Sequence, residues 1–526
     1  MLKSIQELNL GFSDAQNYTQ RGNKQILSEV FVKNIYLENL LKPHVYYLIG
    51  EKGTGKTAYA VFLSNSEYKG NRSILKYIDE TDYEKFYELK KRKQIDVSGY
   101  TDIWKTILLL LLSKSVTNND KVVSMFNKNN LSKLLCAIDE YYNCAFSPEI
   151  ITALKIVDKS ELMAKLIYKN IEAGGNSGSA IEFNEQRLQM NLFYICKKFS
   201  ECLGELKLTK NLTLYIDGID VRPKQIPYSE YLECIKGLSN ACWHLNTELF
   251  ANVRDSKGQF KIVLLLRPDI FQSLNLQNST NKLLDNSVFL DWRTTYTNYS
   301  SSNLYRMANK LLSYGQEEKD ISLIWEQYFN WKLPTSNFEQ RKNDTAFMEF
   351  LRISLSRPRD IQRILSLIRD IMIEHNMGDD HVFSYDIYNS DQFQNAYSEY
   401  FLSSLKDQLA FYYSEEDYRH FKKFFDLFSD PQFTFDEYIK AYEKYVNYIL
   451  ENANDIPQFV DDPKSFLQFL YDCNLIAAIE GEGRFFHFSY REKSHSNIVP
   501  EVPYGTDIEY RFHYGVYKKA RLGRYN

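Results

Sequence analysis

The sequence predicts an α/β fold, in which a parallel sheet covered by helices is followed by an all-helical region and a mixed C-terminal domain. Short apolar runs that suit buried strands alternate with helical segments, but only as far as Trp292. Beyond that residue the patterns are helical, until two strand-like runs near residue 480. Strands that alternate with helices indicate a parallel sheet with both faces covered.

Composition restricts the function. At 526 residues the chain is long enough for several domains, and its net charge of −4 argues against a constitutive binder of polyanions. The seven cysteines show no metal-ligand spacing, which suits reduced thiols and a cytoplasmic protein. The first residues lack the apolar core of a signal peptide, and the longest apolar run, 107–112, is too short to cross a bilayer. We therefore expect no membrane association.

The most informative segment is a complete phosphate-binding loop. It follows an apolar, β-prone run at 44–49 and leads into a helical pattern, as a P-loop requires. In such a loop, glycines let backbone N–H groups surround a phosphate, Lys56 reaches the β- and γ-oxygens, and the Thr57 hydroxyl binds Mg²⁺. The sequence thus predicts a P-loop NTPase core that binds a nucleoside triphosphate through Gly50, Glu51, Lys52, Gly53, Thr54, Gly55, Lys56 and Thr57.

We expect this core to span residues 45–295, after a lead segment at 1–44. A second strand is predicted at 73–79, and a mainly helical insertion at about 81–210, with helices at 102–115 and 185–203 and an exposed Gly/Ser loop at 174–179. Further strands are predicted at 212–216, 261–266 and 288–290.

A helical lid is predicted at 296–378 and a linker at 379–392. The lid helices are expected at 304–314, 321–331 and within 345–374. Residues 393–526 show helices at 415–428, 435–451 and 463–472, and then a hairpin at 475–490. Helices that end in a hairpin predict a winged-helix-like domain.

Two aspartates follow the strand at 212–216. Asp217 at the strand tip is expected to hold Mg²⁺; the alternative is an aspartate that only caps the strand. Gly218 follows, so Asp220 is the candidate to orient the attacking water, unless it merely caps the turn. Its short side chain predicts slow hydrolysis.

Three arginines are candidates for phosphate contacts. Arg267 ends the strand at 261–266, where a cation can face the γ-phosphate, although a solvated strand end is the alternative. Arg357 and Arg359 surround Pro358, which suits the first position of a helix. The helix dipole disfavours cations there unless an anion is present. A solvated basic turn is the other interpretation.

In their order, these motifs resemble the AAA+/STAND branch of P-loop ATPases, and most closely the bacterial ATPases found in antiphage defence loci. The resemblance covers residues 45–378 and extends loosely into the C-terminal part. It implies that Lys56 binds phosphate and is catalytic, that Thr57 and Asp217 bind Mg²⁺, and that Arg267 is sensor 1 and the Arg357–Arg359 turn sensor 2. It also implies ATP and Mg²⁺ as cofactors.

On this basis we expect a slow ATPase that acts as a nucleotide-dependent oligomeric switch, controls a separate effector such as a nuclease or toxin, and takes part in antiphage defence. ATP would clamp the lid on the core, and Arg222 or Arg254 would act on a neighbouring subunit. The alternatives are a DNA-handling motor or loader that uses the winged helix and the basic tail at 517–524, and a scaffold with negligible hydrolysis. In the tail, cations that complement a helix end are the other interpretation.

Overall fold

A computed structural model gives the fold of most of the chain. It describes residues 2–78, 83–84, 99–117, 123, 128–144, 196–316, 323–331, 333, 344–453, 456–480, 485–493 and 499–516. The predicted loop at 174–179, most of the predicted helix at 185–203 and the basic tail at 517–524 lie outside these residues.

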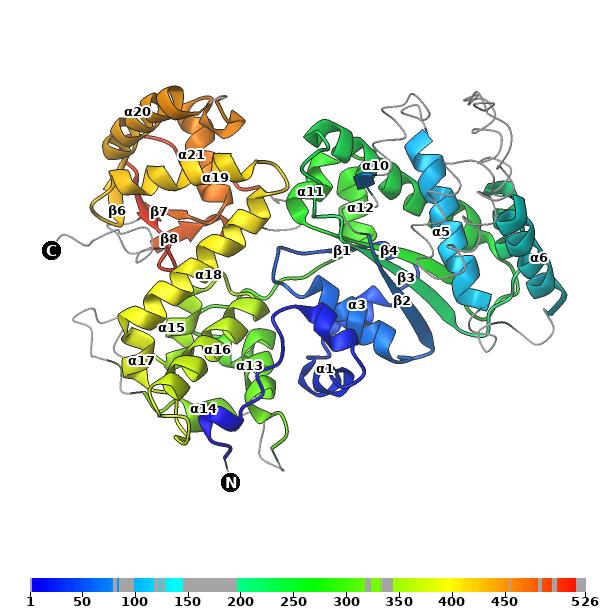
Figure 1. Cartoon of the computed structure of the whole chain (residues 1–526), viewed down its shortest axis with the longest axis horizontal. Helices are drawn as coiled ribbons and strands as arrows, with labels where there is room; N and C mark the ends of the chain where they lie inside the picture. The colour runs from blue at the N-terminus through cyan, green and yellow to red at the C-terminus, as the bar shows by residue number, and fades with distance from the viewer. Residues whose placement is uncertain are drawn as a thin grey trace, which may run out of the picture. The chain divides into compact units, whose positions relative to one another are not determined.

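The chain divides into two compact units. The first contains Met1–Asn34, Gly50–Gly55 and Leu290–Asn526, and the second contains Ile35–Ile49 and Lys56–Phe289. The phosphate loop is therefore split along the chain, because Gly50–Gly55 packs with the first unit and Lys56 opens a helix of the second. Figure 1 shows the elements of each unit.

The second unit is built on a five-stranded sheet in the order β2-β3-β4-β1-β5, and all of its strand pairs are parallel. This confirms the predicted α/β class. Strand β4 lies between β1, which precedes the phosphate loop, and β3, which ends in Asp217. The strands are β1 (Tyr47–Ile49), β2 (Asn71–Tyr77), β3 (Asn211–Asp217), β4 (Phe260–Leu266) and β5 (Ser287–Phe289).

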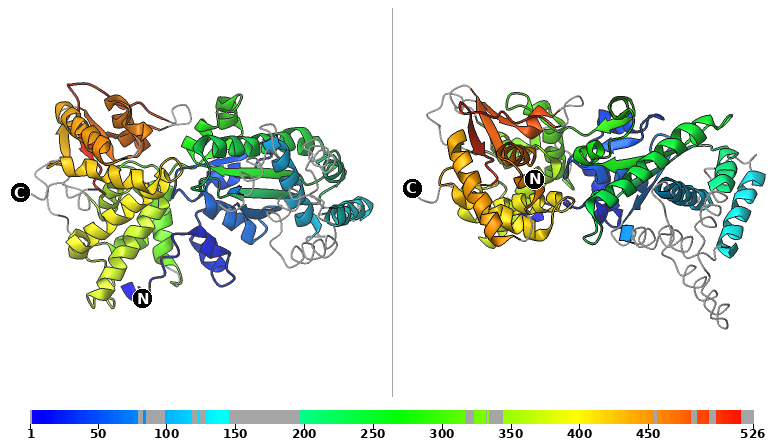
Figure 2. Two further views of the ribbon diagram at one scale, coloured as in Figure 1. Left: turned by 45° about the horizontal axis from the view of Figure 1, so that its top comes forward. Right: turned by 90° about the horizontal axis from the view of Figure 1, so that it is seen from above.

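Helices cover both faces of this sheet. Helix α3, which follows the loop, and helix α10 lie on opposite faces (Figures 1 and 2). Strands β1 and β4 are buried along their whole length because both faces are covered, which accounts for their unbroken apolar sequence. The helices are α2 (Ile35–Leu40), α3 (Lys56–Asn65), α5 (Gly99–Thr117), α6 (Lys128–Cys144), α10 (Tyr228–His244), α11 (Pro268–Ser273) and α12 (Ser279–Asp285).

The first unit contains a group of helices that follows the parallel sheet in sequence. Residues near the N-terminus pack with them, since the Ile5 N–H bonds to the Asp380 carbonyl and the Tyr328 hydroxyl to the Lys3 carbonyl. Long α18 runs from this group towards α19 (Figure 1). The helices are α1 (Lys24–Val30), α13 (Asn303–Ser313), α14 (Ile324–Tyr328), α15 (Ala346–Ile353), α16 (Pro358–Glu374), α17 (Tyr385–Asn389) and α18 (Asp391–Leu409).

The C-terminal part adds a second, antiparallel sheet of four strands in the order β6-β9-β7-β8. The predicted hairpin forms its β7–β8 pair, and β6 and β9 were not predicted. Its strands are β6 (Gln432–Thr434), β7 (Ile476–Glu480), β8 (Phe485–Phe488) and β9 (Glu509–Phe512), and the helices beside it are α19 (Glu415–Phe421), α20 (Phe435–Asn452), α21 (Pro463–Asp472) and α22 (Ser489–Glu492).

The predicted linker at 379–392 contains helical residues in the structure. Phe383 is buried, and two serines begin helices within this range. Ser384 accepts a hydrogen bond from the Ile387 N–H at the start of α17, and Ser390 accepts one from the Phe393 N–H at the start of α18. Such N-caps stabilise helix starts by about 1 kcal/mol, so this polar stretch is helical rather than an extended connection.

None of the helices in the described residues is both long and apolar enough to span a membrane.

Candidate functional site

The phosphate loop connects β1 to α3, as predicted. Gly53 and Gly55 have positive φ angles of 89° and 91°, a conformation that favours glycine. The Thr54 N–H bonds to the Glu51 carbonyl, whereas the N–H groups of Gly53 and Gly55 make no hydrogen bond to any described residue. The loop thus carries unpaired backbone donors immediately before a helix N-terminus, which is the arrangement that binds phosphate.

The carbonyl groups of the loop are held by donors from the first unit. The Lys52 carbonyl accepts a hydrogen bond of 2.8 Å from Arg357 Nη1, and the Thr54 carbonyl one of 2.9 Å from Trp292 Nε1. The Arg359 N–H lies 3.4 Å from the Gly53 carbonyl. The start of α16, where sensor 2 was predicted, therefore packs directly on the phosphate loop.

In the second unit, Thr57 and Asp217 lie side by side. The Thr57 hydroxyl donates to Asp217 Oδ2 over 2.6 Å, and the Gly218 N–H donates to Asp217 Oδ1 over 2.9 Å. Burial, and then the nearby Asp220, raise the pKa of Asp217, while Thr57, Gly218 and Lys56 act in the opposite direction. Lys56 is also buried. The predicted metal ligands are thus adjacent in the fold.

The backbone at Gly218 leaves no room for an acidic side chain directly after Asp217. Its φ is 88°, and a Cβ atom added there would lie 2.2 Å from the Ile78 carbonyl oxygen. No larger residue fits without moving β2, since β2 and β3 are joined at this point by the bond from the Ile78 N–H to the Asp217 carbonyl. The nearest acid that can serve the site is therefore Asp220.

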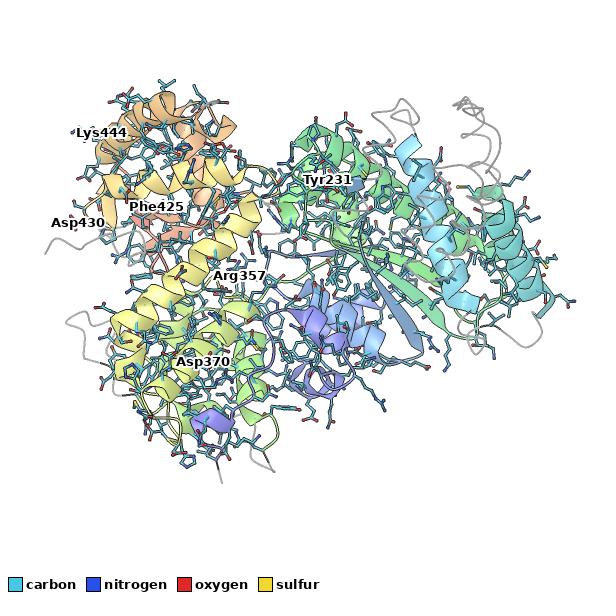
Figure 3. All side chains as sticks on the ribbon, viewed as in Figure 1. Tyr231, Arg357, Asp370, Phe425, Asp430 and Lys444 are labelled. Atoms are coloured by element: carbon cyan, nitrogen blue, oxygen red, sulfur yellow. The ribbon has the colours of Figure 1, made fainter. Side chains whose placement is uncertain are left out.

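The turn that carries Asp220 is held by a tyrosine that sequence reasoning missed. The hydroxyl of Tyr231, which α10 supplies and Figure 3 labels, lies 2.9 Å from the carbonyl oxygens of both Ile219 and Val221. These carbonyls flank Asp220, so Tyr231 fixes the backbone on both sides of it.

Arg267 is buried rather than solvated at the end of β4, and its exposed fraction is only 1%. It forms an ion pair with Asp269, with a distance of 3.0 Å from Arg267 Nε to Asp269 Oδ1 and a second contact through Nη2. The guanidinium thus already has a carboxylate partner in the first turn of α11. A role as phosphate sensor requires it to exchange or share that partner.

Arg357, labelled in Figure 3, is likewise buried and paired. Its Nε and Nη2 atoms lie 2.9 and 3.0 Å from the two carboxylate oxygens of Asp360, which is fully buried. Asp360 also accepts hydrogen bonds from the Leu355 N–H and the Tyr400 hydroxyl. Charge-assisted bidentate pairs fix geometry well, so this network orients Arg357 towards the loop carbonyl.

Arg359 differs from both other arginines. It is half-buried, and its guanidinium makes no hydrogen bond or ion pair with any described residue. Its Cβ would lie 3.4 Å from a Cβ added at Gly53, so its side chain begins beside the loop. Of the predicted sensor residues, Arg359 is the one with an uncommitted charge.

Two charged loop side chains contact the C-terminal part of the first unit. Glu51 Oε1 lies 2.7 Å from Lys493 Nζ, and Lys52 Nζ lies 3.1 Å from Asp407 Oδ2 on α18. The first pair is more buried than the second, in which the Asp407 side chain is 63% exposed. Lys52 therefore makes two contacts: its carbonyl accepts a hydrogen bond from Arg357, and its side chain forms a surface ion pair with Asp407.

The arginines predicted to act on a neighbouring subunit have different surroundings. Arg254 is exposed, whereas Arg222 is half-buried and donates to the Ile226 carbonyl over 2.6 Å. Sequence reasoning also missed Trp292 and Tyr400, which reach the site from distant parts of the chain. It missed the role of Asp360 as well. The one available signal was an aspartate three positions after Arg357, the spacing of an ion pair within one helical turn.

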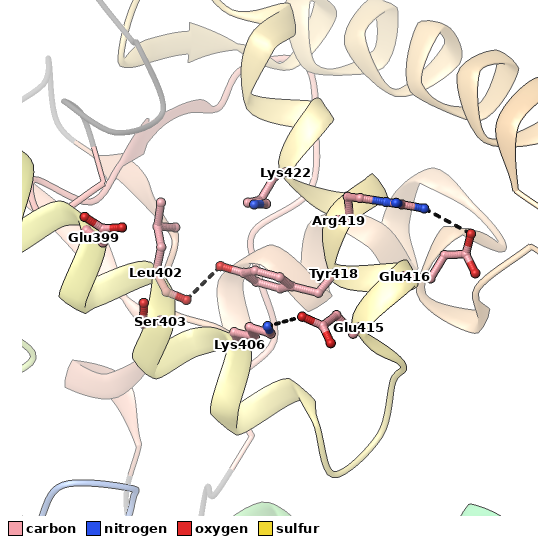
Figure 4. A pocket seen from close by; sticks show the side chains of 9 residues that line it. All are labelled: Glu399, Leu402, Ser403, Lys406, Glu415, Glu416, Tyr418, Arg419 and Lys422. Atoms are coloured by element: carbon pink, nitrogen blue, oxygen red, sulfur yellow. Dashed lines mark hydrogen bonds and ion pairs between the residues drawn. The ribbon is translucent and has the colours of Figure 1, made fainter. Parts of the chain in front are cut away.

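A pocket in the C-terminal part, shown in Figure 4, contains none of the predicted site residues. Its charges largely neutralise each other, since Lys406 pairs with Glu415 and Arg419 pairs with Glu416. The Tyr418 hydroxyl donates to the Leu402 carbonyl. This pocket offers no convergent polar set, and the phosphate loop stays the better candidate.

The donor set of the loop fits a Mg²⁺–triphosphate. Within the described residues, no cluster of three or more His, Cys, Asp or Glu side chains could hold a metal ion by itself. Thr57 and Asp217 supply two adjacent oxygen atoms, and Mg²⁺ is usually held by one or two protein groups together with phosphates and water. Comparisons of the sequence with protein-family models and with curated proteins gave no match.

Proposed function

We propose that this protein binds ATP with Mg²⁺, hydrolyses it slowly, and acts as a nucleotide-dependent switch. The observation that carries the proposal is the phosphate loop between β1 and α3, with Thr57 Oγ1 2.6 Å from Asp217. Mg²⁺, when bound, supplies charge that stabilises the transferred phosphoryl group. The protein contributes Lys56 as a fixed cation and the N–H groups of Gly53 and Gly55 as donors.

The fold supports the finer architecture that we propose. The parallel sheet would be a P-loop NTPase core, because β4 neighbours β1 and so brings Arg267 to the strand end next to the loop. Helices α13–α16 would be the lid, and α18–α22 with the antiparallel sheet would be a winged-helix-like domain.

Slow hydrolysis follows from the acid turn. Gly218 cannot be replaced by a larger acid in this backbone, so water activation falls to Asp220, whose turn Tyr231 holds in place. A carboxylate that orients water must lie within hydrogen-bond reach of it. We assign this role to Asp220, and metal binding to Asp217.

The first test is nucleotide binding by Lys56→Ala. We expect the affinity for ATP–Mg²⁺, measured by titration with a fluorescent analogue, to fall at least about tenfold, or ~1.4 kcal/mol, because a charge-assisted contact in a buried site is lost. Lys224→Ala, at an exposed lysine of the same unit, is the matched control. Equal affinity and turnover in both variants would remove the assignment.

The two aspartates can be separated. Asp217→Asn should weaken Mg²⁺-dependent binding or abolish turnover, whereas Asp220→Asn should keep the affinity and slow hydrolysis, because metal coordination and water orientation are different tasks. Phosphate release measured over a Mg²⁺ titration distinguishes them. If both variants hydrolyse ATP at the wild-type rate, residues 217–220 form only a turn.

The switch has its own test. A nucleotide shifts a conformational equilibrium only through contacts that differ between the two states. Because the loop is shared along the chain by both units, we expect particle mass, measured by light scattering with ATP, ADP and no nucleotide, to depend on ATP. A strict monomer in all three conditions, with or without the effector, contradicts the switch. If DNA stimulates turnover about tenfold or more, which corresponds to an activation free energy lowered by ~1.4 kcal/mol or more, the DNA-handling motor is favoured.

A further inference from the structure

Trp292 contacts the phosphate loop in a way that its sequence position does not suggest. It follows β5 by three residues and lies in the first unit together with Gly50–Gly55. Its indole N–H donates to the Thr54 carbonyl over 2.9 Å, and the residue is 7% exposed. A buried indole N–H usually has a hydrogen-bond partner, and here that partner is a backbone carbonyl of the predicted phosphate loop.

The peptide plane between Thr54 and Gly55 provides one. A trans peptide is planar, and its C=O and N–H point in opposite directions. When Trp292 fixes the Thr54 carbonyl, it also fixes the direction of the Gly55 N–H, which makes no hydrogen bond to any described residue. Arg357 holds the preceding unpaired donor, the Gly53 N–H, in the same way through the Lys52 carbonyl.

Glycine makes this restraint necessary. Gly55 has no Cβ and is conformationally permissive, so its peptide can rotate at little steric cost. A donor that is already oriented needs no ordering when the phosphate binds, and this raises affinity. We propose that Trp292 is a positioning residue of the phosphate loop, which orients the Gly55 N–H for the phosphates of the nucleotide. This inference rests on the proposed nucleotide-binding function.

The test is Trp292→Phe, which keeps an aromatic ring and removes the N–H donor. We expect the affinity for ATP–Mg²⁺ and for inorganic tripolyphosphate to fall by the same factor, roughly three- to tenfold, as the loss of one buried hydrogen bond predicts. The affinities for both ligands should fall by the same factor because the Gly55 N–H contacts phosphate and not the base.

Trp331→Phe is the matched control. The Trp331 indole also donates to a backbone carbonyl of the same unit, that of Phe383, over 2.6 Å, but it does not touch the loop. Both variants lose one indole–carbonyl bond, so both should lose a similar amount of thermal stability, and only Trp292→Phe should lose affinity. The tryptophan emission change on nucleotide binding should persist in Trp331→Phe and shrink in Trp292→Phe.

The outcomes separate the two proposals. If the wild-type protein binds neither ATP nor tripolyphosphate, the proposed function fails and the role of Trp292 with it. If Lys56→Ala loses affinity while Trp292→Phe binds like the wild type, nucleotide binding stands and Trp292 only packs. Equal losses of affinity in both tryptophan variants would also overturn the inference, because they would report general destabilisation.

Discussion

Two helices of this protein begin in the same way but have different charges. In α11 and in α16, an arginine precedes the proline that opens the helix, and an aspartate of the first turn binds the arginine. The pairs are Arg267 with Asp269 and Arg357 with Asp360. Only α16 has a second arginine, Arg359, between its proline and its aspartate. The α11 start is therefore balanced, and the α16 start keeps one positive charge.

The difference shows that position alone does not identify a phosphate sensor. A strand end and a helix start were both reasonable sites for one, since each can face a bound anion. In the fold, Arg267 and Arg357 are committed to carboxylates, and Arg357 additionally holds a loop carbonyl. We therefore expect Arg359 to make the phosphate contact at α16, and Arg357 to hold the loop in place.

The two aspartates should differ most in stability. Asp360 is fully buried and has three partners, whereas the Asp269 side chain is 30% exposed. Asp360→Asn leaves a buried guanidinium unpaired, which we expect to cost about 3–5 kcal/mol. Asp269→Asn should cost roughly 1–2 kcal/mol, because water can replace part of an exposed partner.

Urea denaturation of both variants measures this difference. Equal losses of unfolding free energy would mean that the two helix starts are equivalent and that the burial of Asp360 has no energetic consequence. The comparison needs no nucleotide, so it is independent of the proposed function.

A buried histidine beside the α16 start should add a pH dependence to the stability of the protein. His513 is fully buried behind it, stacked on Phe401. Burial, followed by the charge of Arg491 and also that of Arg357, lowers its pKa from 6.5 to about 3, while Asp360 acts in the opposite direction. The unfolded chain then binds a proton that the folded protein excludes, so stability is lost as pH falls from 6.5 towards 3.

His513→Asn should reduce this loss, which we expect to be on the order of a few kcal/mol in the wild type. The asparagine oxygen can replace Nδ1 as the acceptor of the Gly515 N–H, so the variant keeps that hydrogen bond. Denaturation curves between pH 7 and pH 3.5 measure the slope (roughly spanning the two pKa values). His375→Asn, at an exposed histidine, should retain the wild-type slope. If His513→Asn shows the same slope as the wild type and His375→Asn, the burial of His513 does not cause the pH dependence.

How far the sequence predicted these features depends on the range of the interactions. The strands of the parallel sheet lie within two residues or so of their predicted positions, because each is a local apolar run bounded by turn residues. The start of α16 at Pro358 follows equally from local chemistry. In contrast, β6 and β9 pair over a long separation in the chain and are short, so no local pattern marks them.

The candidate site divides in the same way. The loop, Thr57 and Asp217 could be predicted, because a motif fixes their spacing. Trp292 and Tyr231 could not, since each binds backbone carbonyls that folding brings to it. The sequence shows that Asp269 lies two residues after Arg267. Only the structure shows that Arg267 is buried and that the two side chains form an ion pair.

The nucleotide response should separate the arginines. Arg359→Ala should weaken ATP binding about tenfold, or ~1.4 kcal/mol, with little loss of stability, because the removed charge has no partner in the described part of the chain. Arg267→Ala should mainly destabilise the fold, since it removes the ion pair between Arg267 and Asp269. Titrations with ATP and ADP, with melting temperatures alongside, measure both effects. ATP affinity that falls in Arg267→Ala and not in Arg359→Ala would reverse the assignment.

The smallest expected effect concerns the third partner of Asp360. The Tyr400 hydroxyl donates to Asp360 Oδ1 over 2.9 Å. Tyr400→Phe should therefore destabilise the protein by about 1 kcal/mol, the typical net value of one hydrogen bond.

Tyr397, its neighbour on α18 with ring centroids 5.7 Å apart, supplies the control, because its buried hydroxyl has no hydrogen-bond partner among the described residues. Tyr397→Phe removes an unsatisfied polar group and should be neutral or stabilising. Denaturation midpoints of the two variants decide the matter: if they move together, the hydroxyl of Tyr400 adds nothing to the α16 start beyond its ring, and the two helix starts differ only in Arg359 and in burial.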